Sequence, residues 1–285
     1  MDFVKTLNCP LIPWMRNLVS HNVLSKLMNF ILNYYPYIPK LTMKLSAILR
    51  NIAEGASDPQ TLVKKIQNPS LVSFVFCKNL KLFSTTELGG NIQRIIDVGA
   101  NEGQFAFMAR YCWPLAQIDC YEPDPSAYSK LMNLYKLYKN DPKIQVKNYA
   151  IGSISGTLKL NLGQVSANNS FMVEKNKPSC GSIEVGVKTL NEIYYQQNLE
   201  NSLLKIDVQG YELEVLKGAS EILGQISFVL VEISLAEIFE GGPSIIDIWQ
   251  LLTNYGYVYY RIIDQYREPE TERIVQMDIL FYRKK

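Results

Sequence analysis

Two carboxylates stand where the sequence predicts the ligand-binding ends of strands. Asp207 lies near the end of the apolar run 203–208, and Glu232 takes the matching place in the next such run, 226–233. Because open α/β sheets bind ligands at the carboxyl ends of their strands, both acids could serve as a general base, a substrate clamp or a metal site. Lys205 shares the first run, and a buried charge there requires a partner. A purely structural ion pair with Lys205 is therefore the alternative.

A glycine-rich turn, Asp97-Val-Gly-Ala-Asn-Glu-Gly103, lies between a short apolar run and a helical pattern. Gly99 allows a tight turn and Gly103 lets the backbone approach a ligand, while the amides at the helix start face electron-rich groups. Asp97 is placed to hold an ammonium group of such a ligand, directly or through water. This context is typical of a nucleotide-binding turn, although a packing turn that binds nothing has the same glycines.

A third acid, Glu122, closes the following predicted strand within Tyr121-Glu-Pro-Asp-Pro125, 23 residues after Gly99. A carboxylate at that place accepts hydrogen bonds from both ribose hydroxyls of an adenosine. Pro123 and Pro125 stiffen the turn and direct the carboxylate. Together with the glycine-rich turn, Glu122 indicates an adenosine-containing cofactor.

The charge beside the turn favours S-adenosylmethionine over a dinucleotide. A pyrophosphate usually needs the pattern G-x-G-x-x-G, but Asn101 replaces its middle glycine and Glu102 stands at the helix start. The negative charge of Glu102 repels a diphosphate, yet it is compatible with a cationic sulfonium. An NAD(P)-dependent Rossmann oxidoreductase remains the competing enzyme class.

These residues need a sheet to position them, and the surrounding pattern predicts one. From residue 94 onward, strand-like and helix-like segments alternate at intervals of about 25 residues, as in parallel βαβ units. Two extra strands are predicted at 157–161 and 183–187. The last two strands, 257–263 and 274–282, have only a polar turn between them and should pair antiparallel. The expected fold is α/β and Rossmann-like, a mostly parallel seven-stranded sheet with an antiparallel C-terminal hairpin, as in class I methyltransferases.

Residues 1–88 are predicted to form a helical extension or cap that precedes the domain 89–285. Their first 50 residues hold six basic side chains and one acid, a net +5, whereas the whole chain is +2. The basic and amphipathic stretch 1–55 predicts either peripheral contact with a membrane, a cap packed on the domain, or pairing in a homo-oligomer. A catalytically inactive, membrane-associated binding protein of the same fold is the non-enzymatic alternative.

The composition limits the chemistry and the partners. The single histidine, His21, lies outside every motif, and the five cysteines include no C-x-x-C pair, so no metal site is predicted. A net charge of +2 gives no signature of polyanion binding, and no nucleic-acid partner is expected. Without an apolar run long enough to span a membrane or a secretory signal, a cytoplasmic location, at most peripheral to a membrane, is expected.

Four strings of the sequence resemble, in order and spacing, the FkbM family of S-adenosylmethionine-dependent methyltransferases. They are Asp97-Val-Gly-Ala-Asn-Glu-Gly103, Tyr121-Glu-Pro-Asp-Pro125, Ala150-Ile-Gly152 with Gly156-Thr-Leu158, and Leu204-Lys-Ile-Asp-Val-Gln-Gly-Tyr-Glu212 with Leu216-Lys-Gly-Ala219. The resemblance covers roughly residues 91–235, and its most specific part surrounds Asp207. Gln209 stands where many members have Glu.

The resemblance implies a class I methyltransferase fold and transfer of a methyl group from S-adenosyl-L-methionine to a hydroxyl oxygen. The implied acceptor is a glycan or a small hydroxylated metabolite. The implied cofactor contacts are Asp97, Gly99, Ala100, Asn101, Gly103, Glu122, Pro123, Asn148 and Ala150.

Such a reaction needs mainly alignment, because a sulfonium already activates the methyl group. A carboxylate that takes the proton of the attacking hydroxyl adds a factor of roughly 10² to 10⁴. Asp207 is the first candidate for this base and Glu232 the second, and Lys205 completes the predicted catalytic set. A divalent ion held by both carboxylates is a further hypothesis.

Overall fold

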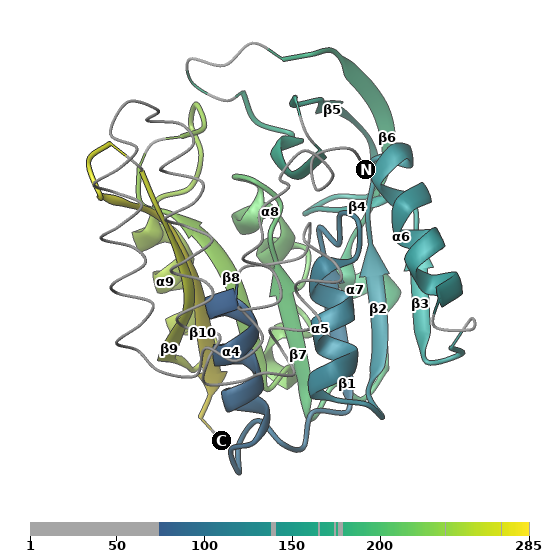
Figure 1. Cartoon of the computed structure of the whole chain (residues 1–285), viewed down its shortest axis with the longest axis vertical. Helices are drawn as coiled ribbons and strands as arrows, with labels where there is room; N and C mark the ends of the chain where they lie inside the picture. Colours follow the sequence, from purple (N-terminus) through teal and green to yellow (C-terminus); the bar gives the residue numbers. More distant parts are fainter. Residues whose placement is uncertain are drawn as a thin grey trace, which may run out of the picture. The chain divides into compact units, whose positions relative to one another are not determined.

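The computed structural model describes residues 74–137, 141–164, 166–173, 175, 179–236, 238–268 and 270–284 (Figure 1). The first described element is helix α4, Phe74–Ser84. Most of the predicted N-terminal extension, including the whole of the predicted membrane-contact segment 1–55, thus lies outside the described residues. Its role as a cap, membrane anchor or subunit contact stays a prediction.

The centre of the domain is a seven-stranded sheet with the order β3-β2-β1-β7-β8-β10-β9. Its parallel strands are β1 (Arg94–Val98), β2 (Gln117–Tyr121), β3 (Ile144–Lys147), β7 (Ser202–Ile206) and β8 (Phe228–Ser234). The antiparallel C-terminal pair consists of β9 (Tyr257–Arg267) and β10 (Ile274–Arg283), and β10 runs antiparallel to β8. The predicted class I methyltransferase sheet is therefore confirmed.

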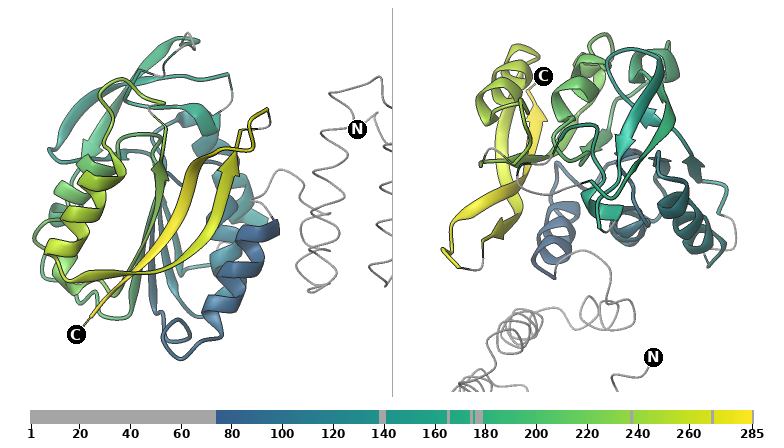
Figure 2. Two further views of the ribbon diagram at one scale, coloured as in Figure 1. Left: turned by 90° about the vertical axis from the view of Figure 1, so that its left-hand side faces the viewer. Right: turned by 90° about the horizontal axis from the view of Figure 1, so that it is seen from above.

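Helices cover both faces of this sheet, which explains why its central strands are apolar almost throughout (Figure 2). The helices that follow β1 and β2 lie on one face, and those that follow the small sheet, β7 and β8 lie on the other. In chain order they are α5 (Gln104–Cys112), α6 (Pro125–Leu137), α7 (Leu190–Ile193), α8 (Glu212–Lys217) and α9 (Ile245–Asn254), with the 3₁₀ turn η3 (Leu223–Gln225) after α8. Every residue of β7 is consequently buried.

The two extra strands that the sequence predicts belong to a second, three-stranded sheet. Its order is β4-β6-β5, with β4 at Ala150–Ile151, β5 at Gly156–Asn161 and β6 at Ser182–Lys188. A small apolar core of its own holds this sheet together, centred on Leu160, Val185 and Val187. The connection from β5 to β6 carries the 3₁₀ turn η2, Ser166–Asn168.

One edge of the large sheet collects the residues that the motifs single out. The parallel strands β1, β2, β7 and β8 all end at this edge, and antiparallel pairing brings the end of β9 and the start of β10 to the same place. β9 continues to Arg267 rather than ending at 263 as predicted, because its last four residues, 264–267, also pair with β10 although most of them are polar. Among the described helices, none combines the length and apolar character that a membrane span requires.

Candidate functional site

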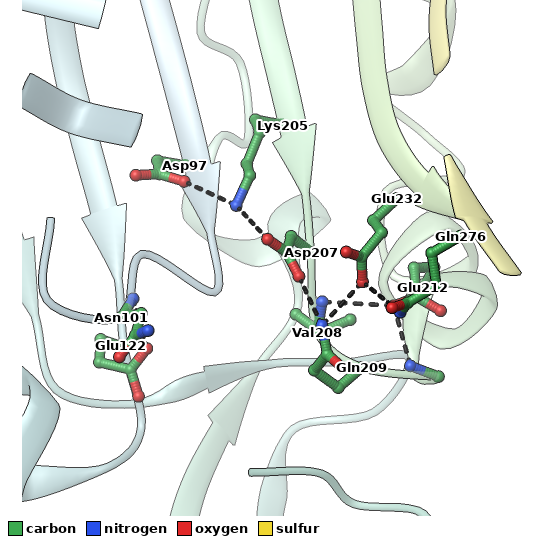
Figure 3. Close-up of polar contacts among 11 residues, drawn as sticks. Asp97, Asn101, Glu122, Lys205, Asp207, Val208, Gln209, Glu212, Glu232 and Gln276 are labelled. Carbon is green, nitrogen blue, oxygen red and sulfur yellow. Dashed lines mark hydrogen bonds and ion pairs between the residues drawn. The ribbon is translucent and has the colours of Figure 1, made fainter. Parts of the chain in front are cut away.

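A cavity of about 780 Å³ lies at this edge, within the size range of pockets for small molecules and cofactors. It extends from the end of β2, past β1 and β7, to the hairpin β9–β10. Seven residues of the predicted site line it: Gly99, Asn101, Glu122, Pro123, Ala150, Asp207 and Glu232. Figure 3 shows Asn101 and Glu122 on one side of the site and Asp207, Glu232 and Gln276 on the other.

The glycine-rich turn bends as its sequence requires. Gly99 has a φ of +79° and Gly103 a φ of +93°, both in the left-handed region. A Cβ on Gly99 would collide with the carbonyl oxygen of Asp207, so the turn passes directly against the end of β7. The amides of Gly99 and Ala100 both donate to the carbonyl oxygen of Tyr121, each at 3.0 Å. Ala100 and Gly103 do not line the cavity, and in this structure they support the turn.

Glu122 is held rigidly at the end of β2. Its Oε2 accepts a hydrogen bond from the amide of Asn101 at 2.7 Å, and its Oε1 accepts one from the amide of Asp124 at 2.8 Å. Burial raises its pKa to about 7, although these two backbone hydrogen bonds oppose the rise. Asn148 does not line the cavity; its Nδ2 donates to the carbonyl oxygens of Glu122 and Pro123 at 2.9 and 3.1 Å. Asn148 thus supports the turn, and direct contact with a cofactor stays a prediction.

A buried ion pair lies beneath the cavity floor. Nζ of Lys205 is 3.0 Å from Oδ2 of Asp207 and 3.7 Å from Oδ1 of Asp97. Asp97 is 0% exposed, and neither of its carboxylate oxygens accepts a hydrogen bond within the described part of the chain. Burial accordingly raises the pKa of Asp97 to about 6, against the opposing charge of Lys205. The structural ion pair that the sequence left open is present, and Lys205 makes it with Asp97 and Asp207.

An amide joins the two candidate bases (Figure 3). Nε2 of Gln209 donates to Oδ1 of Asp207 at 3.0 Å and to Oε2 of Glu232 at 2.7 Å. Nε2 of Gln276, on β10, also donates to Oε2 of Glu232, at 3.1 Å. The backbone of Gln209 has a φ of +53°, and its carbonyl oxygen accepts a hydrogen bond from the hydroxyl of the buried Ser170 at 2.6 Å. The β5–β6 connection is thereby fastened to the catalytic candidates.

The two carboxyls differ in charge state. Burial alone would raise the pKa of Asp207, but the charge of Lys205 and the hydrogen bonds from Lys205 and Gln209 lower it below its usual value. Burial raises the pKa of Glu232 well above its usual value, and the negative charges of Asp207 and Asp278 add to the rise. The surroundings therefore favour the ionised form of Asp207 and the protonated form of Glu232. An ionised carboxylate is the form that accepts a proton.

The acid at the start of α5 is paired. Oε1 of Glu102 lies 2.6 Å from Nζ of Lys130, and Glu102 does not line the cavity. Its repulsion of a diphosphate is therefore weaker than its place in the sequence suggests. The preference for S-adenosylmethionine over a dinucleotide then depends mainly on the replacement of the middle glycine by Asn101.

The structure brings together residues that the sequence did not assign to the site. Gln209 lies inside the motif around Asp207 and was noted only for its difference from Glu. Gln276 reaches the site because β10 pairs with β8, and nothing near it in the sequence marks it. The hydroxyl of Ser170 lies in a polar loop whose contacts no local pattern reveals.

No group of three or more His, Cys, Asp or Glu side chains is placed to hold a metal ion within the described ranges. The hypothesis of a divalent ion between Asp207 and Glu232 also conflicts with the geometry. The amide of Gln209 donates to both carboxyls, and a hydrogen-bond donor in that place repels a cation.

Comparison with known proteins gives a consistent assignment. The model of the family described as "Methyltransferase FkbM domain" matches residues 97–259, which include Glu122, Asp207 and Glu232 but not the cavity-lining residues of the β9–β10 hairpin. Among curated relatives, methyltransferase sdnD of Sordaria araneosa is 35% identical over 158 residues, covering 45% of this chain and 60% of sdnD. Hexuronic acid methyltransferase AglP of Haloferax volcanii is 28% identical, covering 48% of this chain and 54% of AglP.

A third relative, 2-O-methyltransferase NoeI of Sinorhizobium fredii, is 25% identical over 230 residues, covering 76% of this chain and 88% of NoeI. The chain spans 60% of the length of sdnD and 54% of the length of AglP.

Proposed function

The chain belongs to the FkbM family of methyltransferases, and we propose that it transfers the methyl group of S-adenosyl-L-methionine to a hydroxyl oxygen of a glycan or a small hydroxylated metabolite. One observation carries this proposal. A single cavity joins a rigid carboxylate of the type that binds ribose, Glu122, to an ionised carboxylate that can accept a proton, Asp207.

The residues at the β1–β2 end fit the proposed cofactor. Each carboxylate oxygen of Glu122 accepts one hydrogen bond from a backbone amide. Each oxygen has a further acceptor site, and these sites can bind two ribose hydroxyls. Gly99 lines the cavity with its backbone alone, and the space that a side chain would need is taken by the carbonyl of Asp207. Asp97 has two carboxylate oxygens without a hydrogen bond, so a cationic amine near the floor of the cavity would give it a partner, directly or through water.

When bound, S-adenosylmethionine supplies a methyl group that its sulfonium already activates. The chain then has to orient the acceptor and move one proton. Asp207 takes the proton of the attacking hydroxyl at Oδ1, which accepts one hydrogen bond from Gln209 and keeps a second acceptor site, whereas its Oδ2 is paired with Lys205. Lys205 favours the ionised form of Asp207, and the raised pKa of Glu232 favours a protonated carboxyl that donates a hydrogen bond to the acceptor. S-adenosylhomocysteine would be the leaving group.

The choice of an oxygen acceptor rests on two observations. The proton-accepting group is a carboxylate rather than an imidazole or a thiolate, since no His or Cys lines the cavity within the described residues. Two relatives have names that point the same way, one a hexuronic acid methyltransferase and the other a 2-O-methyltransferase. Acceptor identity and the role of residues 1–88 remain separate proposals.

Calorimetry with S-adenosylmethionine, S-adenosylhomocysteine and NAD tests the cofactor assignment. We expect binding of the first two and none of the third. Tight binding of NAD without a response to the others would favour the oxidoreductase alternative. Incubation with labelled donor and a set of hydroxylated glycans and metabolites then tests turnover, and cofactor binding without transfer to any of them would favour an inactive binding protein.

A further inference from the structure

The half of the cavity left for the acceptor can be located from the strand order. The glycine-rich turn and Glu122 belong to β1 and β2, so a cofactor bound there occupies that side of the sheet edge. The remaining lining comes from the other side. Apart from the small sheet and its β5–β6 connection, it consists of residues after β7, in and after β8, and at the facing ends of β9 and β10, among them Gln209, Glu232, Tyr266, Glu268, Glu270 and Gln276.

The charge of this acceptor half is one-sided. Asp207, Glu268 and Glu270 line it beside Glu232, whose raised pKa favours the protonated form, whereas no described lining residue of the whole cavity is Lys, Arg or His. The buried cation nearby, Lys205, is already paired with Asp97 and Asp207. A negatively charged acceptor would therefore enter a confined site with several acids and no cation to pair with, which is costly in a region of low dielectric.

The same half contains groups suited to an uncharged sugar. Tyr266 is 57% exposed and lines the cavity mouth, where its ring offers an apolar face to the C–H side of a pyranose. Gln276 and Gln209 line the cavity as well; their Nε2 groups donate to Asp207 and Glu232, and their amide oxygens can accept hydrogen bonds from hydroxyls. Such an arrangement binds hydroxyl groups and an apolar ring face without supplying a counter-charge for an anion.

We infer that the acceptor carries no negative charge and is a neutral or amino sugar, and that Glu268 and Glu270 discriminate against uronic acids and phosphorylated sugars. This inference rests on the proposed function and narrows its substrate class. Oγ1 of Thr271 donates a hydrogen bond to Oε2 of Glu268 at 2.6 Å and so holds this carboxylate in place. Glu270 is exposed at the rim of the cavity.

The test is a set of matched pyranosides that differ only in charge: a methyl glycoside, its amino-sugar analogue and its uronic acid, each offered with labelled donor. We expect kcat/KM for the neutral or amino sugar to exceed that for the uronic acid by about tenfold or more. In the double variant Glu268→Gln/Glu270→Gln this ratio should fall to about threefold or less. Added salt should also reduce the wild-type ratio, because the rim is open to solvent.

A matched control is Glu272→Gln, which removes the same charge from an exposed residue of the same hairpin that does not line the cavity. The control should leave the ratio unchanged. Equal or faster transfer to the uronic acid in the wild-type protein would overturn the inference, and so would an equal fall of the ratio in the control and the double variant.

If none of the three sugars is methylated, that result counts against the proposed function. The inference about acceptor charge is then tested by measuring sugar binding. The protein loaded with S-adenosylhomocysteine should bind the neutral or amino sugar more tightly than the uronic acid in a ligand-observed NMR titration. Equal or stronger binding of the uronic acid, or binding of none of the three, would overturn the inference.

Discussion

The two ends of the cavity are built in different ways. At the β1–β2 end, two backbone amides hold Glu122: that of Asn101, in the turn after β1, and that of Asp124, in the turn after β2. At the β7–β8 end, side chains from separate strands hold one another, with Gln209 between Asp207 and Glu232. Backbone geometry therefore fixes the first end, whereas hydrogen bonds and ion pairs among side chains fix the second. Substitutions at the two ends should therefore affect different steps.

The largest effect is expected for Asp207→Asn. The amide cannot take the proton of the acceptor, so kcat should fall by roughly 10²- to 10⁴-fold while the Kd for the cofactor changes little. Steady-state kinetics and calorimetry measure the two quantities. Glu232→Gln is the matched control: the raised pKa of Glu232 favours its protonated form, and an amide in its place should cost only about tenfold. Intact turnover in Asp207→Asn would show that Asp207 is not the base.

Gly99→Ala should damage the cofactor end and the fold together. The new Cβ collides with the carbonyl of Asp207 at a φ of +79°, and the strain should lower the free energy of unfolding by at least about 2 kcal/mol. Cofactor binding should weaken as the turn shifts. Chemical denaturation and calorimetry follow the two effects. Gly224→Ala is the control, since nothing lies within 4 Å of a Cβ there. Equal behaviour of the two variants would contradict the close approach of the turn to β7.

The pKa of Glu122 predicts how cofactor binding depends on pH. Burial raises this pKa to about 7, so protonation below pH 7 removes acceptor capacity from the carboxylate. Cofactor affinity should therefore fall as the pH is lowered from 8 to 6, by at most about tenfold per unit. The free protein should show the opposite trend, because a raised pKa stabilises the protonated folded state. Its free energy of unfolding should fall as the pH rises from about 4.5 to 7.

Glu122→Gln should flatten the pH dependence of cofactor affinity and reduce that of stability, to which the raised pKa of Asp97 also contributes. Glu184→Gln, which changes an exposed glutamate on β6, should alter neither. Calorimetry and denaturation at several pH values measure them. A cofactor affinity that stays constant between pH 6 and 8 in the wild-type protein would show that Glu122 does not bind the cofactor through its charge.

The same contrast explains what the sequence could predict. The strand–helix alternation and the terminal hairpin predicted the sheet, and Gly99 and Glu122 were recognisable because each lies in a short motif beside a predicted strand. Gln276 was not recognisable, since only the pairing of β10 with β8 brings it to Glu232. The pairing of Glu102 with Lys130, 28 residues later, and the bridging amide of Gln209 likewise depend on side-chain positions that no local pattern contains.

The smallest effect is expected for Gln276→Leu, which tests whether the two ends act separately. This change removes one hydrogen bond to Glu232, worth about 1 kcal/mol or fivefold in binding. Because Gln276 belongs to the acceptor half, KM for the acceptor should rise by about that factor while the Kd for the cofactor stays constant. Gln145→Leu, an exposed change on the edge strand β3, should alter neither constant. An equal loss of cofactor affinity in Gln276→Leu would show that the two ends of the cavity are coupled. Asp207 would then be the residue that connects them, because its carbonyl oxygen packs against Gly99 and its carboxylate accepts a hydrogen bond from Gln209.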